Sequence, residues 1–254
     1  MKKIALCFSG GLRTYEIAGP TVHEFVLEPL RKKGYDIDVF LYGLANRDGI
    51  KDNTEKFCKM FSPKKFVIKD WNEEAEAECM SNFTEHQLAT MHQFCPRKDK
   101  FVNYFSEMYN LKKVFELMNE YETENDFKYD LVIRSRMDVY YFREFPDDQL
   151  ELASKGNVLI PSNWDFKDVR NYAIANCGAI GSRDEMCKYA AIYDHLFQTV
   201  SESRFFHAEA TNGFYLTYVA KVPVVGIPRD KDQWAYEWPP LVEKTTVDRY
   251  EYGV

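Results

Sequence analysis

The sequence predicts an α/β protein in which a mostly parallel sheet is covered by helices, and three observations support this. Short apolar runs of strand length alternate with segments of helical periodicity along the chain. Residues 101–118 carry apolar side chains at helical spacing, as expected for a long helix packed on a sheet. Finally, the apolar run 131–133 leads directly into charged residues, which is typical of a buried strand that ends at a functional edge.

The first half of the chain alternates strands and helices. We expect strands at residues 3–8, 36–42 and 65–68, and helices at residues 21–31 and 51–61. Thr21 is expected to cap the first helix and Gly34 to stop it. Residues 71–96 are acidic, then polar, and poorly periodic, so irregular helices and loops over the sheet edge are expected there.

The second half begins with the long helix, which leads into the strand around Val132. Further strands are expected at residues 157–161, 172–181 and 222–227, and further helices at residues 183–200 and 206–219. No internal repeat and no linker interrupt the 254 residues, so we expect a single domain.

The composition limits the possible classes of function. Hydrophobic residues make up 45% and aromatic residues 16% of the chain, which is enough for a folded core. The formal net charge is −7, whereas nucleic-acid-binding proteins usually have a basic face, so no nucleic-acid partner is expected. The 6 cysteines are scattered and form no C-x-x-C pair, so they lack the spacing of a zinc site.

The chain has no obvious targeting or membrane-spanning segment. Met1-Lys2-Lys3 leads straight into the first strand-like run, which is too short for a secretory signal. No apolar run approaches the ~20 residues that span a bilayer. We therefore expect a cytoplasmic protein with reduced thiols, and delivery to a membrane surface by partner proteins is compatible with this.

A glycine-rich segment, Ser9-Gly10-Gly11-Leu12-Arg13-Thr14, follows the first strand and is expected to form a tight turn. Glycines let backbone N–H groups approach a phosphate, and a following helix adds a favourable dipole. Arg13 can bind a diphosphate with two parallel hydrogen bonds. The segment thus predicts a phosphate site, although an ordinary turn between strand and helix would use the same glycines.

Arg134, Arg136 and Asp138 follow the central strand. A hard cation such as Mg²⁺ or Mn²⁺ binds carboxylate oxygens together with diphosphate oxygens, which makes Asp138 the candidate metal ligand. The two arginines are candidates for binding an anionic ligand. A salt-bridge cluster at the end of a strand is the alternative.

A third motif, His207-Ala208-Glu209, opens the late helix, with Asn212 one turn further on. Glu209 is a candidate general base, or a group that orients one. Acidic residues also favour the first turn of any helix, so a purely structural role is equally compatible with the pattern.

Small residues and aromatic residues complete the set of candidates. A sugar-sized ligand could approach the backbone at Asn176-Cys177-Gly178, although a bend before a helix capped by Ser182 explains this segment as well. Trp234, Tyr236 and Trp238 could stack on a sugar or a base, or could pack in the core or a lid.

Taken together, these motifs resemble the GT-A-type nucleotide-sugar glycosyltransferases, especially the small bacterial and large-DNA-virus proteins that build surface polysaccharides and glycans. The resemblance rests on the order strand–S-G-x-x-R-T, long helix, Y-D-x-V-I-R-x-R-x-D, and H-x-E, and is best over residues 4–14, 105–139 and 174–219. It implies a single GT-A-like, Rossmann-type domain. Residues 1–140 would be its nucleotide-binding half, and residues 141–254 its acceptor-side half and tail.

The resemblance also implies roles for individual residues. The nucleotide would be contacted by Phe8, Ser9, Gly10, Gly11, Arg13, Thr14, Arg134 and Arg136. The acceptor or sugar would be contacted by Asn176, Gly178, His207 and Asn212. In that family the second motif is a D-x-D element, but here Arg136 stands in place of the first acid. Only Asp138 therefore carries over as a ligand of Mn²⁺ or Mg²⁺, and Arg136 could partly replace the cation.

The implied reaction moves a sugar from a nucleoside diphosphate sugar to a hydroxyl of a glycan or glycoconjugate acceptor. The metal on Asp138 and the arginines would stabilise the charge that develops on the leaving diphosphate. An inverting reaction needs a carboxylate that takes the acceptor proton; Glu209 is the first candidate and Asp165 or Asp168 are weaker ones. A retaining reaction would need no such base.

Two other interpretations stay open. Ser9-Gly10-Gly11 after a first strand resembles the S-G-G-x-D-S motif of PP-loop ATP pyrophosphatases and adenylating enzymes, although Arg13-Thr14 replaces the Asp-Ser pair. The incomplete acidic motif also fits a non-catalytic module that binds a sugar nucleotide.

Overall fold

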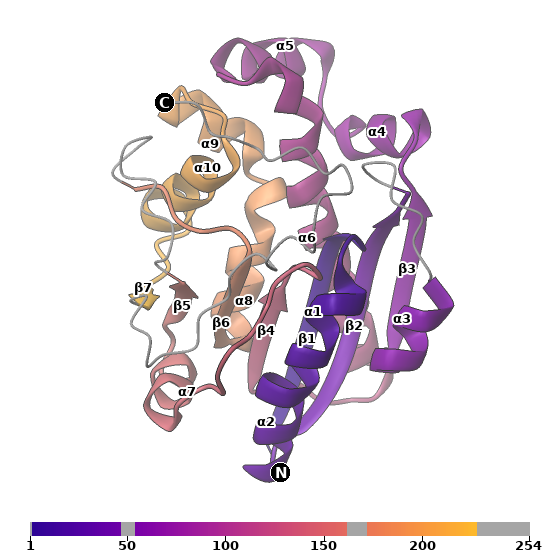
Figure 1. Ribbon diagram of the computed structural model, residues 1–254. Coiled ribbons are helices and arrows are strands. Elements are labelled where there is room, and N and C mark those ends of the chain that lie inside the picture. The colour runs from indigo at the N-terminus through magenta and orange to yellow at the C-terminus, as the bar shows by residue number, and fades with distance from the viewer. Residues whose placement is uncertain (1, 47–53, 162–171, 228–254) are drawn as a thin grey trace.

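One mixed sheet with helices on both faces forms the frame of the protein (Figure 1). The computed structural model describes residues 2–46, 54–161 and 172–227. In these residues the sheet has seven strands, in the order β3-β2-β1-β4-β6-β5-β7. Their bounds are β1 Lys3–Gly11, β2 Asp36–Ala45, β3 Lys65–Asp70, β4 Leu131–Ser135, β5 Val158–Pro161, β6 Gly178–Ser182 and β7 Val224–Ile227.

The sheet is mostly parallel, as the sequence predicts. β1 is parallel to both β2 and β4, β2 is parallel to β3, and β5 is parallel to β7. Only β6 runs against its neighbours β4 and β5. The predicted α/β class is therefore confirmed, with one reversed strand that the alternation of elements does not reveal.

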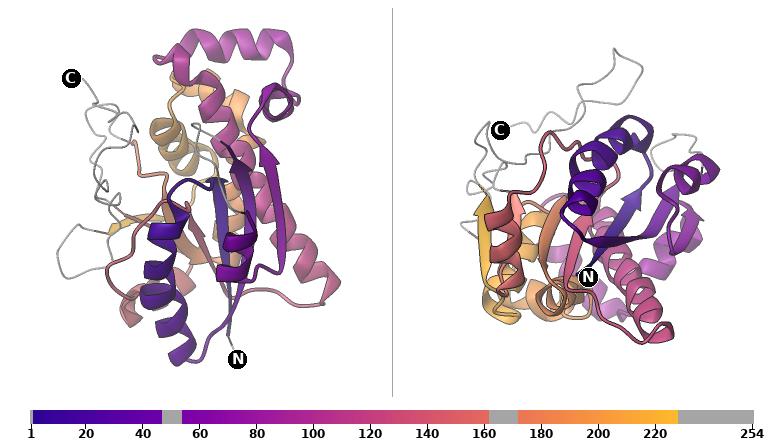
Figure 2. Two further views of the ribbon diagram at one scale, coloured as in Figure 1. Left: turned by 45° about the vertical axis from the view of Figure 1, so that its right-hand side comes forward. Right: turned by 90° about the horizontal axis from the view of Figure 1, so that it is seen from below.

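The helices cover the two faces of the sheet in separate groups (Figures 1 and 2). One face is covered by α1 Tyr15–Val22, α2 Glu28–Lys32, α3 Thr54–Phe61 and α7 Asp147–Ser154. The other is covered by α6 Phe101–Glu124, α8 Arg183–Ala190, α9 Leu196–Ser203 and the region after α10 Ala208–Phe214. Two further helices, α4 Glu73–Met80 and α5 Glu85–Phe94, precede α6. None of the helices in these three ranges is long and apolar enough to cross a membrane.

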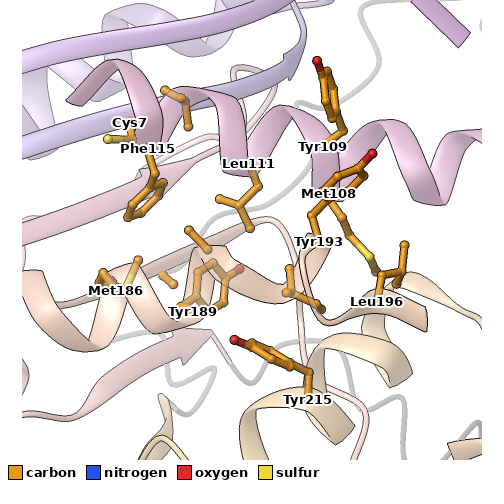
Figure 3. Close-up of a cluster of buried hydrophobic side chains, with 14 of the residues drawn as sticks. Cys7, Met108, Tyr109, Leu111, Phe115, Met186, Tyr189, Tyr193, Leu196 and Tyr215 are labelled. Atoms are coloured by element: carbon orange, nitrogen blue, oxygen red, sulfur yellow. The ribbon is translucent and has the colours of Figure 1, made fainter. Parts of the chain in front are cut away.

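Alternate residues of the central strands pack into two hydrophobic cores. In β1, Leu6 and Phe8 face α1 to α3, while Cys7 faces α6. This period of two is the ordinary geometry of a strand, in which successive side chains point to opposite faces. Figure 3 shows the core on the α6 side, where Leu111 and Phe115 of α6 point towards the helix α8.

The first glycine motif lies in a strand rather than a turn, contrary to the prediction. Gly10 pairs with Gly43 and Gly11 with Leu44, so the parallel ladder of β1 and β2 continues through both glycines. Gly10 has a φ of 109°, a conformation that other residues rarely adopt. The actual turn comprises residues 12–14, and the amide of Tyr15 donates to the carbonyl of Leu12 at 3.2 Å.

The prediction that Thr21 caps the first helix was wrong. The helix begins at Tyr15, and Thr21 lies inside it. Its hydroxyl donates to the carbonyl of Ala18 at 2.7 Å and accepts from the amide of Tyr141 at 3.0 Å. Thr21 therefore binds a segment that is distant in the sequence, although threonine is a residue type that often caps helices.

Other predicted elements differ in length and regularity. Residues 71–96 contain two regular helices, with Asn72 and Thr84 as capping residues whose side chains accept from backbone amides. The helix expected at residues 183–200 is divided by a 3₁₀ turn at Ala191–Tyr193. The late helix continues after α10 as a π-helical turn at Tyr215–Val219. The strand expected from residue 172 begins only at Gly178, because the backbone before it bonds elsewhere: the amide of Ile174 donates to Glu209 and the carbonyl of Cys177 accepts from Arg136.

The division of the chain at residue 140 stays a prediction. The sheet itself crosses that boundary, since β4 of the first half pairs with β6 of the second from Leu131↔Ser182 to Ser135↔Gly178. The two proposed halves therefore share one sheet.

Candidate functional site

The candidate site lies where the chain order of the sheet reverses. From β1 the chain first adds β2 and β3 on one side, and later adds β4 on the other side. The carboxyl ends of β1 and β4 are adjacent, with Phe8 paired to Ser135. In open α/β sheets, ligands bind at such a reversal, at the carboxyl ends of the strands. Both predicted anion-binding motifs follow these two strand ends.

The structure brings Arg13, Arg136 and Asp138 into direct contact. The carboxylate of Asp138 accepts two hydrogen bonds from Arg136, from Nε at 3.0 Å and from Nη2 at 2.7 Å. It also accepts one from Nη1 of Arg13 at 2.9 Å, across 125 residues of sequence. Two planar guanidinium groups therefore hold one carboxylate, one of them in the two-bond arrangement that arginine favours.

The two arginines keep Asp138 ionised although it is buried. Burial raises the pKa of Asp138, but the charges and hydrogen bonds of Arg136 and Arg13 outweigh it, so the pKa lies well below its usual range. Burial lowers the pKa of Arg136, but Asp138 outweighs that effect and the pKa is raised. The cluster of these three described side chains thus joins two cations to one anion.

The backbone at Arg13 is in the left-handed region, with a φ of 45°. For a residue with a side chain, this conformation costs on the order of 1–3 kcal/mol and persists only where surrounding contacts hold it. Here the amide of the preceding Leu12 donates to the carbonyl of Leu44 at 3.1 Å, which anchors the turn to β2. The strained turn directs the guanidinium of Arg13 to Asp138.

Arg134 lies beneath α6 and binds partners other than Asp138. It has the same parity in β4 as Val132, so its side chain points beneath α6 and is only 1% exposed. Its Nη1 donates to the carbonyl oxygen of Asn176, and its Nη2 lies 3.8 Å from Glu107 of α6. The sequence did not single out Glu107, and no local pattern marks it as a partner of Arg134.

The segment 174–177 connects the two parts of the site. At one end, the amide of Arg136 donates to the carbonyl of Cys177 at 3.0 Å. At the other end, the amide of Ile174 donates to the carbonyl of Glu209 at 3.2 Å. Just before it, a Cβ on Gly213 would overlap the carbonyl oxygen of Tyr172, so α10 can approach this segment closely only because residue 213 is glycine.

His207 and Glu209, the candidates of the third motif, lie in contact with each other at the start of α10. Glu209 lies in the first turn of α10, and its Oε2 is 2.9 Å from Nδ1 of His207. The ring of Tyr104 from α6 lies 5.2 Å from the imidazole ring. Both side chains are 12% exposed, so this acid is covered but can be reached from solvent.

The remaining candidates are placed as follows. Phe8 packs on Phe57 and Phe61 in the core, so a ligand could meet only its backbone. Thr14 precedes α1 but makes no side-chain capping bond. The residues Ser9, Asn176 and Asn212 are buried polar residues, and Gly178 is buried at the start of β6. Asp165, Asp168, Trp234, Tyr236 and Trp238 lie outside the described residues.

The residues at Asp138 do not fit a divalent cation in the arrangement described. Both oxygens of its carboxylate accept hydrogen bonds from guanidinium groups, and two cations already flank it. Within the part of the chain that the structure describes, no three His, Cys, Asp or Glu residues are grouped so that they could hold a metal ion. The metal role of Asp138 stays a prediction from sequence.

Comparisons with known proteins give a family and a distant structural likeness. A family model described as "Domain of unknown function (DUF7796)" matches residues 1–173. No curated protein matches the sequence. Among solved structures, the chain is similar to the apo form of mouse xyloside xylosyltransferase 1, with 9% sequence identity, a TM-score of 0.46, and coverage of 89% of this chain and 84% of that one. A likeness of this degree carries no argument about activity, so the function is argued from the site.

Proposed function

The chain belongs to the family described as a domain of unknown function (DUF7796), and we propose from its site that it is a glycosyltransferase. The proposed reaction moves a sugar from a nucleoside diphosphate sugar to a hydroxyl of a glycan or glycoconjugate acceptor. The fold would then be a GT-A-like variant of the Rossmann arrangement, which agrees with the motifs in the sequence.

The observation that carries this proposal is the pair of arginines at the reversal of the sheet. Arg13 and Arg136 come from the ends of two adjacent parallel strands and meet at one carboxylate. Guanidinium groups match phosphate oxygens in geometry as well as in charge. A diphosphate is the chemical group that best suits a partly exposed arginine pair at this edge.

The second part of the site suits a sugar and its acceptor. The four residues from Ile174 to Cys177 span at most about 14 Å when extended, which limits the distance between the backbone near Glu209 and that near Arg136. A sugar attached to a diphosphate can bridge such a gap. Asn176, Gly178, His207 and Asn212 are the candidates for contacts to the sugar or acceptor.

In the proposed step, the acceptor oxygen forms a bond to the anomeric carbon while the bond from that carbon to the diphosphate breaks. The electron pair of the broken bond stays on the diphosphate, where Arg13 and Arg136 stabilise the new charge. In an inverting reaction, the proton of the acceptor hydroxyl passes to the carboxylate of Glu209. His207 would hold that carboxylate in place.

The experiment that tests the proposal is a screen of UDP-, GDP-, dTDP- and CMP-sugars by thermal unfolding, with EDTA and with Mn²⁺. We expect at least one diphosphate donor to raise Tm. The CMP-sugar serves as the control, since it has a single phosphate and should have no comparable effect. If no diphosphate sugar changes Tm under either condition, the proposal fails.

A module that binds a sugar nucleotide without catalysis is the second candidate. It is favoured by one observation, the engagement of both Asp138 oxygens by arginines. Donor binding without transfer or hydrolysis of the donor would support this module. ATP turnover to AMP and pyrophosphate would instead support the PP-loop interpretation.

A further inference from the structure

Asp138 lies behind the arginines that it binds. Its side chain is 3% exposed, whereas those of Arg136 and Arg13 are 19% and 27% exposed. A ligand that approaches from solvent therefore reaches the guanidinium groups before it reaches the carboxylate. A metal ligand would need the opposite arrangement. A cation that links the protein to a diphosphate must lie between the carboxylate and the diphosphate, so the carboxylate would have to be the more accessible group.

A divalent cation at Asp138 would also meet unfavourable charges. It would have to displace N–H groups at 2.7, 2.9 and 3.0 Å from the carboxylate oxygens, and it would then lie beside two guanidinium groups. Like charges at such distances repel strongly in a partly buried site. Magnesium, in addition, gives up its bound waters reluctantly.

We propose that the protein binds the diphosphate of its donor directly through Arg13 and Arg136, without a divalent cation, and that Asp138 is a positioning residue for both arginines. This inference deepens the proposed function and rests on it for the identity of the ligand. Arg136 stands where the related D-x-D element has its first acid, and the second acid orients arginines instead of a metal.

The backbone supports the same assignment. Arg13 is held in a left-handed conformation next to an anchored Leu12, and the amide of Arg136 is bonded to Cys177. Both arginines are therefore fixed at the main chain as well as at the carboxylate. A site that is ordered before the ligand arrives loses less entropy on binding.

The test measures binding of inorganic pyrophosphate to the full chain by isothermal titration calorimetry, first with EDTA and then with Mg²⁺. We expect binding in EDTA, and equal or weaker apparent affinity with Mg²⁺, because free Mg²⁺ competes for the pyrophosphate. Binding that requires Mg²⁺ would overturn the inference.

Conservative variants assign the role to individual residues. Arg13→Lys and Arg136→Lys keep the charge but lose the planar fork, and each should weaken pyrophosphate binding in EDTA by about tenfold or more. Asp138→Asn should weaken it by a similar factor, because the arginines lose their orientation, and Asp138→Glu should restore part of it. Unchanged affinity in Asp138→Asn would remove the positioning role.

A second ion pair in the chain provides matched controls. Arg97 binds Asp99 with the same two-bond geometry, at 3.1 and 3.0 Å, on the connection between α5 and α6. Arg97→Lys and Asp99→Asn make the same chemical changes and should leave pyrophosphate affinity unchanged. If a variant at Asp138 does not fold, the Mg²⁺ dependence of the unaltered protein and the two lysine variants still decide the outcome.

The result also separates this inference from the proposed function. Donor or pyrophosphate binding that appears only with a divalent cation overturns the direct arginine contact and leaves glycosyl transfer standing. Pyrophosphate binding in EDTA without a response to any sugar nucleotide overturns glycosyl transfer and leaves the direct contact standing.

Discussion

Asp138 and Glu209, the two carboxylates of the proposed site, have different surroundings. Asp138 accepts three hydrogen bonds from two arginines, and its low pKa makes it a poor proton acceptor. Glu209 lies next to a single histidine and remains partly accessible. Such a difference in environment is how two acids in one site take separate roles. On this ground Glu209, and not Asp138, is the candidate base.

The first residue-scale prediction concerns Glu209→Gln. With the donor that the screen identifies, we expect kcat to fall by about 10²–10⁴-fold, because the acceptor proton loses its carboxylate. The Kd of the donor should change little, since Arg13 and Arg136 bind its diphosphate. Glu202→Gln on α9 is the control, because this glutamate accepts a hydrogen bond from Nε2 of Gln198 on its own helix at 2.9 Å. Full activity in Glu209→Gln would exclude the proposed base.

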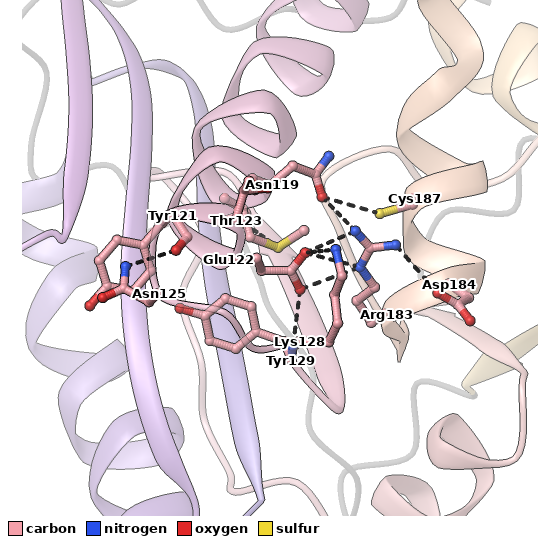
Figure 4. Close-up of polar contacts among 12 residues, drawn as sticks. Asn119, Tyr121, Glu122, Thr123, Asn125, Lys128, Tyr129, Arg183, Asp184 and Cys187 are labelled. Atoms are coloured by element: carbon pink, nitrogen blue, oxygen red, sulfur yellow. Dashed lines mark hydrogen bonds and ion pairs between the residues drawn. The ribbon is translucent and has the colours of Figure 1, made fainter.

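At the scale of elements, one buried glutamate connects α6, α8 and the segment before β4, at the amino end of that strand (Figure 4). Glu122 near the end of α6 accepts from Arg183 at the start of α8, with Nη2 at 2.8 Å. It also accepts from Nζ of Lys128 at 3.0 Å and from the amide of Tyr129 at 2.9 Å, just before β4. These contacts fix where α6 ends and where β4 begins, and so they help to position the strand that carries the site.

We expect Glu122→Gln to lower the free energy of unfolding by about 1–3 kcal/mol at pH 7, because charged hydrogen bonds to a buried group are lost. Burial raises the pKa of Glu122, but Arg183, the Tyr129 amide and Lys128 outweigh it and the pKa is lowered. A lowered pKa in the folded state stabilises the protein above the ordinary value of 4.5, and this contribution is lost as pH falls through the folded pKa.

Urea unfolding from pH 7 to pH 3 measures this effect. The difference between the unaltered protein and Glu122→Gln should be constant above pH 4.5 and should shrink below it. Glu124→Gln is the control, because this glutamate pairs with Lys65 at a side-chain exposure of 57% and should have little effect. A pH-independent difference would show that the charge of Glu122 contributes nothing to stability.

At the scale of the whole molecule, one sheet separates two cores that both cross the middle of the chain. Phe105 of α6 lies at the centre of one core, in ring contact with Phe83, Phe101 and Phe206. These rings come from three different segments of the sequence, since Phe101 and Phe105 both belong to α6. Because the sheet and its cores are continuous across residue 140, the chain should unfold as one unit.

We therefore expect Phe105→Ala to lower the free energy of unfolding by about 3–5 kcal/mol and to shift all probes together. Near-UV and far-UV circular dichroism in urea would measure this, with one shared midpoint as the expected result. Phe66→Ala is the control, since Phe66 on the edge strand β3 is 48% exposed. Two separate transitions would indicate that the halves fold independently.

The sequence could predict those strands, helices and strand ends that are determined by the pattern of neighbouring residues. The apolar runs of β1 and β2 and the helical spacing of Phe101 to Met118 place these elements close to where they occur. The strand end with Arg136 and Asp138 is also evident from the abrupt change to charged residues. In each case the signal lies within a few residues of the feature that it predicts.

The sequence could not predict which distant partner a residue meets. Arg134 and Arg136 are equivalent in the pattern, yet Arg134 lies within β4, beneath α6 and near Glu107, whereas Arg136 follows the end of the strand and binds Asp138. The contact of Arg13 with Asp138 and the reversed direction of β6 depend on strand order, which local periodicity does not specify. Thr21 likewise contacts Tyr141 rather than capping a helix.

The left-handed backbone at residue 13 has a consequence for the evolution of this protein. Glycine would adopt that backbone without strain, so conformational preference alone favours its appearance at this position. We expect an arginine to be retained there only if selection for its guanidinium outweighs the strain of the left-handed backbone. Drift towards glycine at position 13 in a descendant would remove the guanidinium that we propose binds the diphosphate, and would leave the rest of the fold unchanged.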